Sequence, residues 1–307
     1  MRALVIGASG AVGTSIAELL ENAGHAVTRA ARRRHPHSVT VDLRRDVHGF
    51  AQLAPHHDVI INASGVENPA IALHLGGATL VDISATGSYL AALRRAADSA
   101  RASVVLGAGL APGLSTALIG ELGAKPGDEI DVGIMLGSGE KHGAAAVAWT
   151  KSLAGSEIAS RPETEAIRNF RERRTLLGGD GKRRRYLRAD FPDHTLLGPA
   201  GGYAVRSYLA LSSRHLTQAL AVVGAIPQLS SVISAAPALG DDSWALAAVN
   251  RRTGERRSAC GRNQSRATAE LTALLAERSA VSGMHGCVTA HDLATSGELA
   301  AALSTRS

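Results

Sequence analysis

Three glycines at a spacing of three residues stand near the beginning of the 307-residue chain, in the segment VIGASGAVGT (5–14). They follow an apolar, β-branched run and precede an amphipathic stretch, a pattern that predicts a strand, a loop and a helix. In that context Gly7 permits a tight turn, Gly10 lets the backbone approach a pyrophosphate, and Gly13 lets the helix pack closely. The free N–H groups at the helix N-terminus then attract the phosphate anion.

The residues after the next strand indicate which dinucleotide binds. An NAD-binding unit usually carries Asp or Glu there to hold the ribose 2′-hydroxyl, whereas this chain has TRAARRR (28–34). A guanidinium pairs with a 2′-phosphate in bidentate fashion, so the predicted cofactor is NADP(H). Further contacts are expected where later strands end, because open α/β sheets bind ligands at that edge. The predicted cofactor-binding residues are Gly7, Ser9, Gly10, Ala11, Val12, Gly13, Arg29, Arg32, Arg33, Asp42, Ala63, Ser64, Gly65, Ser84 and Gly109.

The elements that must position these residues alternate over the first 125 residues. Short apolar or β-branched runs predict strands at 2–7, 25–30, 38–43, 58–63, 79–84 and 103–108. Amphipathic helices are predicted between them, at 13–24 and 88–102. This alternation is typical of an α/β fold, a Rossmann-type doubly wound parallel sheet.

The alternation ends at AKPGDEID (124–131), where Pro126 and Gly127 predict a domain boundary. The segment 156–183 is polar and rich in arginine, and the sequence leaves open whether it is a loop over a site or an exposed insertion. Longer strands indicate an inserted α+β second domain. Its strands are predicted at 129–136, 184–191, 203–211 and 243–252, and its helices at 144–155, 215–226 and 264–283.

The net charge of +6 and the arginine runs at 32–34, 171–174 and 182–185 raise the question of an anionic partner. No aromatic residues for base stacking interleave these runs and no nucleic-acid-binding motif accompanies them, so solvated basic faces are predicted. No apolar run approaches about 18 residues, the length that crosses a membrane. We therefore expect a cytoplasmic protein that binds neither nucleic acid nor membrane.

Several kinds of chemistry lack their residues. The two cysteines, Cys260 and Cys287, form no disulfide framework or CxxC site. The histidine pairs at 35/37 and 56/57 lie in predicted surface loops without further ligands, so no metal site is predicted. The loop GASG resembles that of the short-chain and extended dehydrogenases, yet no tyrosine of this chain is followed by lysine four residues later. The usual proton donor of those enzymes is therefore missing.

The segment GAGLAPGLSTALIG (107–120), which follows LVDIS (80–84), resembles the saccharopine reductase family, also called saccharopine dehydrogenase-like oxidoreductases. The stretches 203–213 and 261–283 look like that family's second domain and its helix leading back to the nucleotide domain. Ala111 stands where the family often carries an acidic residue, so the resemblance does not extend to an amino-acid substrate.

The resemblance implies a domain organisation. Residues 1–125 and about 284–307 would form the NADP-binding Rossmann domain, and 126–283 the substrate or dimerisation domain. The family's active cleft lies between two such domains, and a homodimer is a further expectation.

The predicted function is hydride transfer from NADPH to an imine or carbonyl of a small-molecule substrate, as the family implies. Two alternatives stay open: a reductase of a C=C bond in a lipid or polyketide intermediate, and an NADP(H)-binding sensor or partner-binding protein without turnover. Ser84 and Tyr89 are candidates to donate to a substrate oxygen or nitrogen. His142 is a candidate acid near neutral pH, and Lys151 a candidate ligand of a substrate carboxylate.

Overall fold

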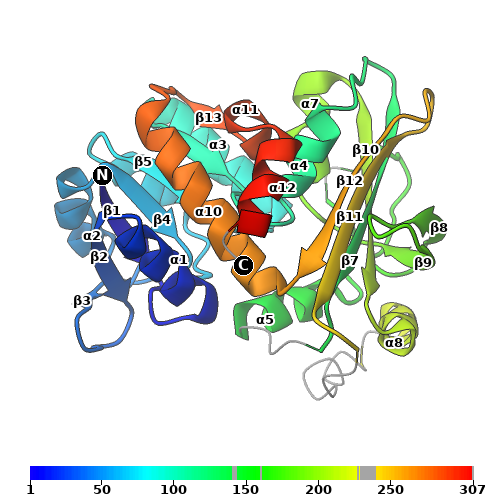
Figure 1. Cartoon of the computed structure of the whole chain (residues 1–307), viewed down its shortest axis with the longest axis horizontal. Coiled ribbons are helices and arrows are strands. Elements are labelled where there is room, and N and C mark those ends of the chain that lie inside the picture. Colours follow the sequence, from blue (N-terminus) through cyan, green and yellow to red (C-terminus); the bar gives the residue numbers. More distant parts are fainter. Residues whose placement is uncertain (140–143, 160, 227, 229–239, 306–307) are drawn as a thin grey trace. The chain divides into compact units, whose positions relative to one another are not determined.

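The computed structural model of the protein describes residues 1–139, 144–159, 161–226, 228 and 240–305 (Figure 1). The chain forms two compact units, Met1–Ala117 with Ser265–Ser307, and Leu118–Gln264. The division expected from the sequence lay near residues 125 and 284. The two divisions differ mainly at one long helix, which was predicted within the second domain and which the structure groups with the first unit.

That helix is α10 (Gln264–Val281). The Thr272 hydroxyl donates to the carbonyl of Ala108, just after the sixth strand, at 2.8 Å. Leu271 and Leu275 are fully buried. This hydrogen bond and the burial of apolar side chains stabilise α10 as part of the first unit.

The sheet of the first unit has seven parallel strands in the order β13-β6-β5-β4-β1-β2-β3. They are β1 (Arg2–Ile6), β2 (Ala26–Ala31), β3 (Val39–Thr40), β4 (Val59–Asn62), β5 (Thr79–Asp82), β6 (Val104–Leu106) and β13 (Cys287–Val288). From β3 to β6 this is the strand order of the doubly wound Rossmann fold. The predicted fold class is confirmed.

Apolar side chains on both faces explain why these strands form the centre of the unit. Leu4 and Val5 of β1 and Ile60 and Ile61 of β4 are fully buried, as is typical of parallel strands covered by helices on each side. Ile16 and Leu20 are buried on the helix that follows β1. The helices of this unit are α1 (Ala11–Asn22), α2 (Val47–Leu53), α3 (Gly87–Ala100), α10, α11 (Ala290–Leu293) and α12 (Ser296–Thr305), with the 3-10 turns η1 (Ala54–His56) and η2 (Pro69–His74), while α4 (Leu114–Gly120) crosses its boundary.

The second unit is built on a six-stranded mixed sheet in the order β12-β11-β7-β10-β9-β8. Its strands are β7 (Glu129–Leu136), β8 (Arg173–Leu177), β9 (Arg183–Arg188), β10 (Ala204–Leu211), β11 (Ser243–Asn250) and β12 (Arg256–Arg262), and its helices are α5 (Ala144–Leu153), α6 (Asp193–Leu196), α7 (Gly198–Gly201) and α8 (Arg214–Ala225). Among the described strands of this sheet, β7 and β10 pair in parallel and the other neighbours are antiparallel. The predicted α+β second domain is confirmed in its architecture.

Two strands of this sheet were not predicted. β8 lies inside the arginine-rich segment 156–183, for which the sequence indicated either a loop over a site or an exposed insertion. β12 (Arg256–Arg262) also carries several polar residues. β8 pairs with β9, which is itself rich in arginine, and β12 pairs with the apolar β11. Pairing between strands therefore decides a conformation that local composition did not indicate.

Within the described ranges, no helix has the length and apolar composition needed to cross a membrane.

Candidate functional site

The glycine loop is pressed against the end of β4. Gly7 has a φ of +89°, and a Cβ there would lie 2.6 Å from the carbonyl oxygen of Ala63. A Cβ on Gly13 would lie 2.2 Å from the carbonyl oxygen of Gly7. Both positions therefore require glycine, because any side chain would push the loop away from β4 or lift α1 off the turn.

The loop ends at the open N-terminus of α1. Gly10 is the N-cap residue and has no side chain to cap the helix, and the first turn carries no acidic residue. The N–H of Gly10 donates to the carbonyl of Gly7 at 2.9 Å, which closes the turn. Ser9, Gly10 and Ala11 are exposed. The first amides of a helix have no intrahelical acceptor, so this turn presents N–H groups and the positive end of the dipole to an anion. The cradle fits a phosphate group.

The arginines that follow the loop fall into two groups. The Arg29 guanidinium on β2 donates to both carboxylate oxygens of Glu21 on α1, at 2.9 and 2.7 Å. Arg32 and Arg33 follow the carboxyl end of β2 and are exposed. Within the described ranges neither forms an ion pair. The unpaired guanidinium groups therefore lie immediately after β2, whereas the arginine within the strand is already paired.

A cavity of about 780 Å³ lies beside the first half of β2. Its lining residues are Val27, Thr28, Arg29, Arg34, His35, Pro36, His37, Ser38 and Val39. They come from β2, from the connection to β3 and from the beginning of β3, and the lining does not include the glycine loop. The cavity and the phosphate cradle are thus separate features of the first unit.

A buried polar cluster joins the carboxyl ends of β4 and β5. Asp82 is fully buried, and its Oδ2 accepts hydrogen bonds from Asn62 Nδ2 and from the Tyr89 hydroxyl, each at 2.8 Å. Its Oδ1 accepts from the N–H of Ser84 at 2.8 Å. Asn62 Oδ1 in turn accepts from the Ser64 hydroxyl at 2.7 Å. The cluster therefore fixes the turns after β4 and β5 to each other.

The electrostatics of this cluster follow from its burial. Burial raises the pKa of Asp82, although the hydrogen bonds from Ser84, Asn62 and Tyr89 oppose the rise by favouring the carboxylate. The pKa of Tyr89 is raised as well, first by burial and then by the negative charge of Asp82. The Tyr89 hydroxyl accordingly keeps its proton and directs it at Asp82.

The structure brings two of the four catalytic candidates together. Ser84 and Tyr89 meet through Asp82. Lys151 is exposed on α5 of the second unit. His142 lies outside the described residues.

Two further predicted cofactor contacts, Asp42 and Gly109, also have structural partners within the chain. The Asp42 carboxylate accepts from the N–H of Arg44 at 3.0 Å and so stabilises the turn after β3. Gly109 is buried, and a Cβ there would lie 3.2 Å from the Thr268 methyl group on α10. Its lack of a side chain permits the close approach of α10.

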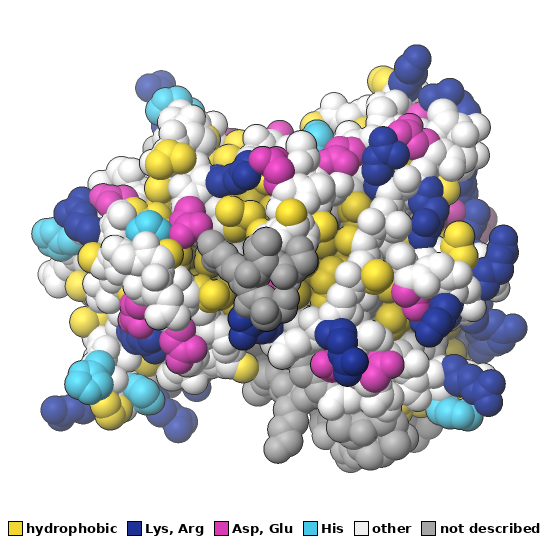
Figure 2. All heavy atoms as spheres, in the orientation of Figure 1, with side chains coloured by type: hydrophobic (Ala, Val, Ile, Leu, Met, Phe, Trp, Pro, Cys, Tyr) yellow, Lys and Arg dark blue, Asp and Glu magenta, His cyan; other side chains and the backbone are white. Residues whose placement is uncertain are grey.

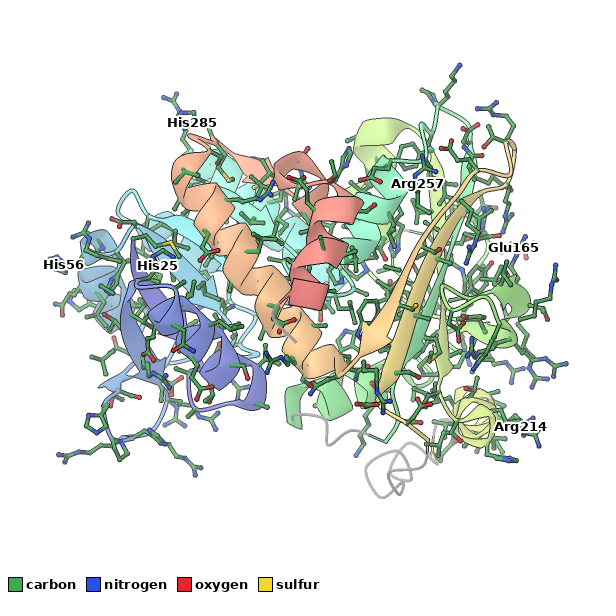
Figure 3. The ribbon with its side chains drawn as sticks, viewed as in Figure 1. His25, His56, Glu165, Arg214, Arg257 and His285 are labelled. Atoms are coloured by element: carbon green, nitrogen blue, oxygen red, sulfur yellow. The ribbon has the colours of Figure 1, made fainter. Side chains whose placement is uncertain are left out.

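One of the histidines that were predicted to lie in surface loops is buried. His57 is only 9% exposed, and its Nε2 lies 2.8 Å from the Thr28 hydroxyl. In the part of the chain that the structure describes, no group of three or more His, Cys, Asp or Glu side chains is arranged to hold a metal ion. Figure 3 labels His25, whose Nε2 lies 3.0 Å from the Glu277 carboxylate.

Sequence reasoning missed Asn62 and Asp82 as members of the site. Each is the last residue of a strand whose other residues are largely apolar, VIIN and TLVD. A polar side chain that ends a buried parallel strand lies at the ligand-binding edge of the sheet, and that position was the available signal.

Residues 3–108, from β1 to just beyond β6, match the NAD dependent epimerase/dehydratase family. A search of curated protein sequences found no match.

Several solved structures are similar over most of the chain. C. glutamicum DAP dehydrogenase in complex with DAP is 15% identical with a TM-score of 0.46, covering 97% of this chain and 95% of that chain. An engineered D-amino acid dehydrogenase bound to NADP⁺ is also 15% identical, with a TM-score of 0.45 and the same two coverages. Dipicolinate-bound dihydrodipicolinate reductase from Paenisporosarcina sp. TG-14 is 10% identical with a TM-score of 0.40, covering 94% of this chain and 97% of that chain.

Proposed function

We propose that the protein is an NADP(H)-dependent oxidoreductase. The main support for this proposal is that a phosphate cradle and unpaired arginines follow two neighbouring strands, β1 and β2, of the Rossmann sheet. The glycine cradle opens onto the N-terminus of α1, and the unpaired Arg32 and Arg33 follow the neighbouring strand β2. The match of residues 3–108 to an NAD-dependent family supports the dinucleotide as the ligand of this cradle.

The 2′-phosphate of NADP(H) is assigned to Arg32 and Arg33. In a Rossmann domain the adenine ribose lies at the carboxyl end of the second strand. The acidic residue that would hold a free 2′-hydroxyl is missing there, and two exposed guanidinium groups follow Ala31 instead. Arg29 contributes indirectly, because its ion pair with Glu21 ties β2 to α1.

The proposed reaction is hydride transfer to an imine or carbonyl carbon of a small molecule, in keeping with the resemblance of 107–120 to saccharopine reductases. The bound nicotinamide supplies the hydride. The chain's own residues orient the reactants. Asp82 holds the turn at Ser84 and, through Asn62, the turn at Ser64, and both turns lie where open α/β sheets bind ligands.

The catalytic candidates receive different roles. Ser84 is proposed to contact the reacting groups, because it lies on the turn after β5 and is not fully buried. Tyr89 is proposed as a positioning residue that acts through Asp82, since its hydroxyl proton is directed at that carboxyl. Lys151 is proposed to bind a substrate carboxylate, and His142 to act as an acid. A cytoplasmic location and a homodimer are also retained as proposals.

The experiment has two stages. First, NADPH and NADH are titrated into the protein and binding is followed by nicotinamide fluorescence, with NADPH expected to bind about tenfold more tightly or better. Second, NADPH oxidation is followed with a panel of 2-oxo acids and aldehydes, each with and without ammonium, and with a panel of enones. Acceleration by ammonium supports reduction of an imine.

The remaining outcomes separate the alternatives. Oxidation by enones alone would replace the proposed reaction with reduction of a C=C bond. Tight binding without oxidation by any compound would favour the sensor over the enzyme. Absence of binding by either nucleotide would overturn the cofactor assignment itself.

A further inference from the structure

The hairpin formed by β8 and β9 carries a set of arginines that the proposed function does not use. Arg173, Arg183 and Arg185 are exposed, and within the described part of the chain none of the three forms an ion pair. Their neighbours Arg174 and Arg184 differ, because they pair with Asp131 at 2.9 Å and Asp180 at 2.5 Å. The arginines of one face are therefore neutralised by this chain, and those of the other face are not. We refer to residues 173–185 as the basic hairpin.

Two of the unpaired arginines, Arg173 and Arg185, line a groove together with the paired Arg174. Its volume is about 310 Å³, and Arg173, Arg174, Thr175 and Arg185 line it. Thr175 lies directly opposite Arg185 in the register of the two strands. Arg173 is the diagonal neighbour of Arg185 on the same face, with about 7 Å between such positions. Two guanidinium groups thus flank one hydroxyl, an arrangement of donors that suits carboxylate or phosphate oxygens.

The side chains of Arg173, Thr175 and Arg185 are exposed on the surface of the second unit. Lys and Arg side chains gather along the margin of the molecule where β8 and β9 lie (Figure 2). Side chains tipped with nitrogen project outward on the same side of the second unit (Figure 3).

β8 also presents an open backbone edge. Among the described strands it lies at the end of the sheet and pairs with β9 alone. The N–H of Arg188 donates to the carbonyl of Glu172, and the N–H of Gly178 donates to the carbonyl of Lys182. In an antiparallel pair the residues that bond to the partner strand alternate, so the even-numbered residues of β8 face β9. The backbone groups of 173, 175 and 177 therefore point to the open edge.

We propose that the open edge of β8 binds an extended acidic segment of a partner protein, which adds to the sheet as a further strand. Backbone hydrogen bonds to 173, 175 and 177 would hold the added strand, and its carboxylates would pair with Arg173 and Arg185. The same charges repel the edge of a second copy of this chain, so they select an acidic strand over self-association. Nucleic acid is the less favoured partner, because the described residues that line the groove include no aromatic side chain for stacking.

Binding is tested with the full-length protein and a fluorescein-labelled peptide of alternating Glu and Val, followed by fluorescence anisotropy. A peptide with Lys in place of Glu and an oligothymidylate of similar length are the comparison probes. We expect the acidic peptide to bind, the basic peptide not to bind, and the affinity of the acidic peptide to fall as salt is raised.

Two variants separate the charge from the backbone edge. The double variant Arg173→Glu and Arg185→Glu is expected to weaken peptide binding about tenfold or more. Thr175→Pro removes an N–H that faces the open edge and leaves the ladder to β9 intact, so it is expected to weaken binding to a similar extent with every arginine present. The control is Arg95→Glu with Arg214→Glu, two exposed arginines on α3 and α8, and it is expected to leave binding unchanged within about twofold.

Hydrogen exchange of the unmodified protein tests the proposal without any variant. Peptide binding is expected to protect the amides of 173, 175 and 177, while those of 174 and 176 are already protected by β9. Failure of these amides to gain protection, or equal binding of Thr175→Pro and the parent, would overturn strand addition. Tighter binding of the oligothymidylate than of the acidic peptide would overturn the choice of partner.

Discussion

The guanidinium of Arg29 is held by the carboxylate of Glu21 through two hydrogen bonds of 2.9 and 2.7 Å, which join β2 to α1. This bond is the first cause of the lowered pKa of Glu21 and of the raised pKa of Arg29. Arg29 is therefore already committed to a partner within the chain. Arg32 and Arg33, a few residues further on, keep their guanidinium groups free for a ligand in the described structure.

This difference predicts which arginines determine the preference for NADPH over NADH. Arg32→Ala combined with Arg33→Ala is expected to weaken NADPH binding about tenfold or more and to leave NADH binding unchanged, because only NADPH carries the 2′-phosphate. Arg29→Ala is expected to change both affinities by a similar small factor. Fluorescence titration of the two nucleotides measures this split. A selective loss of NADPH affinity in Arg29→Ala alone would contradict it.

The capless N-terminus of α1 gives a second prediction. Gly10→Asp places a carboxylate where a helix accepts one readily, so the fold is retained, but the carboxylate competes with the phosphate for the same amides. We expect Gly10→Asp to abolish dinucleotide binding. Gly10→Ala adds the same Cβ, 3.3 Å from the carbonyl oxygen of Gly7, without the charge, and should keep most of the affinity. Loss of binding in both variants to the same degree would show that bulk, and not charge, is responsible.

The buried carboxyl of Asp82 predicts a pH dependence of stability. Burial raises the pKa of Asp82, so the native state holds the proton more tightly than the unfolded chain does. In an unfolded chain the pKa of Asp is about 3.9. The contribution of Asp82 to the free energy of unfolding is then largest below that pH and falls as the pH rises through the higher native value. Urea denaturation of Asp82→Asn is expected to show a flatter slope over that interval.

Asp82→Asn is also expected to lower the stability of the protein at every pH. The NH₂ group of the new asparagine would face hydrogen-bond donors that now bond to the carboxyl oxygens of Asp82. The free energy of unfolding is therefore expected to fall by about 1–3 kcal/mol. Tyr89→Phe is the matched control, because it removes one donor and keeps the carboxyl, so the pH slope should persist. An unchanged slope in Asp82→Asn would assign the titration to another group.

The turn of the basic hairpin supplies a fourth prediction. The Arg184 guanidinium beside Asp180 lowers the pKa of that carboxyl to about 2. Arg184→Gln is expected to return this pKa toward its ordinary value, and Arg185→Gln, which alters the exposed neighbour, is expected to leave it in place. Carboxyl resonances followed by NMR through a pH titration measure both. The stabilisation that Asp180 adds is present above about pH 4 and is lost as the pH falls through the lowered value.

Much of the first unit was predictable because its pattern is local. Glycines at a spacing of three after a β-branched run, and apolar strands alternating with amphipathic helices, depend on neighbours in the chain. The six strands predicted before residue 125 are confirmed as β1 to β6. By contrast, β8 was not predicted, because its arginine-rich composition gives no local strand pattern and the strand forms by pairing with β9.

The sequence by itself determined the Rossmann sheet, the glycine cradle and the acidic residue missing after β2, since each depends on residue type at a fixed local spacing. Only the tertiary structure decided which side chains meet. It paired Arg29 with Glu21 and joined Asn62, Asp82 and Tyr89. It also left the exposed arginines of the basic hairpin without an ion pair among the described residues. Residues far apart in the chain are brought together by packing of the whole unit, and that packing is not encoded in any one segment.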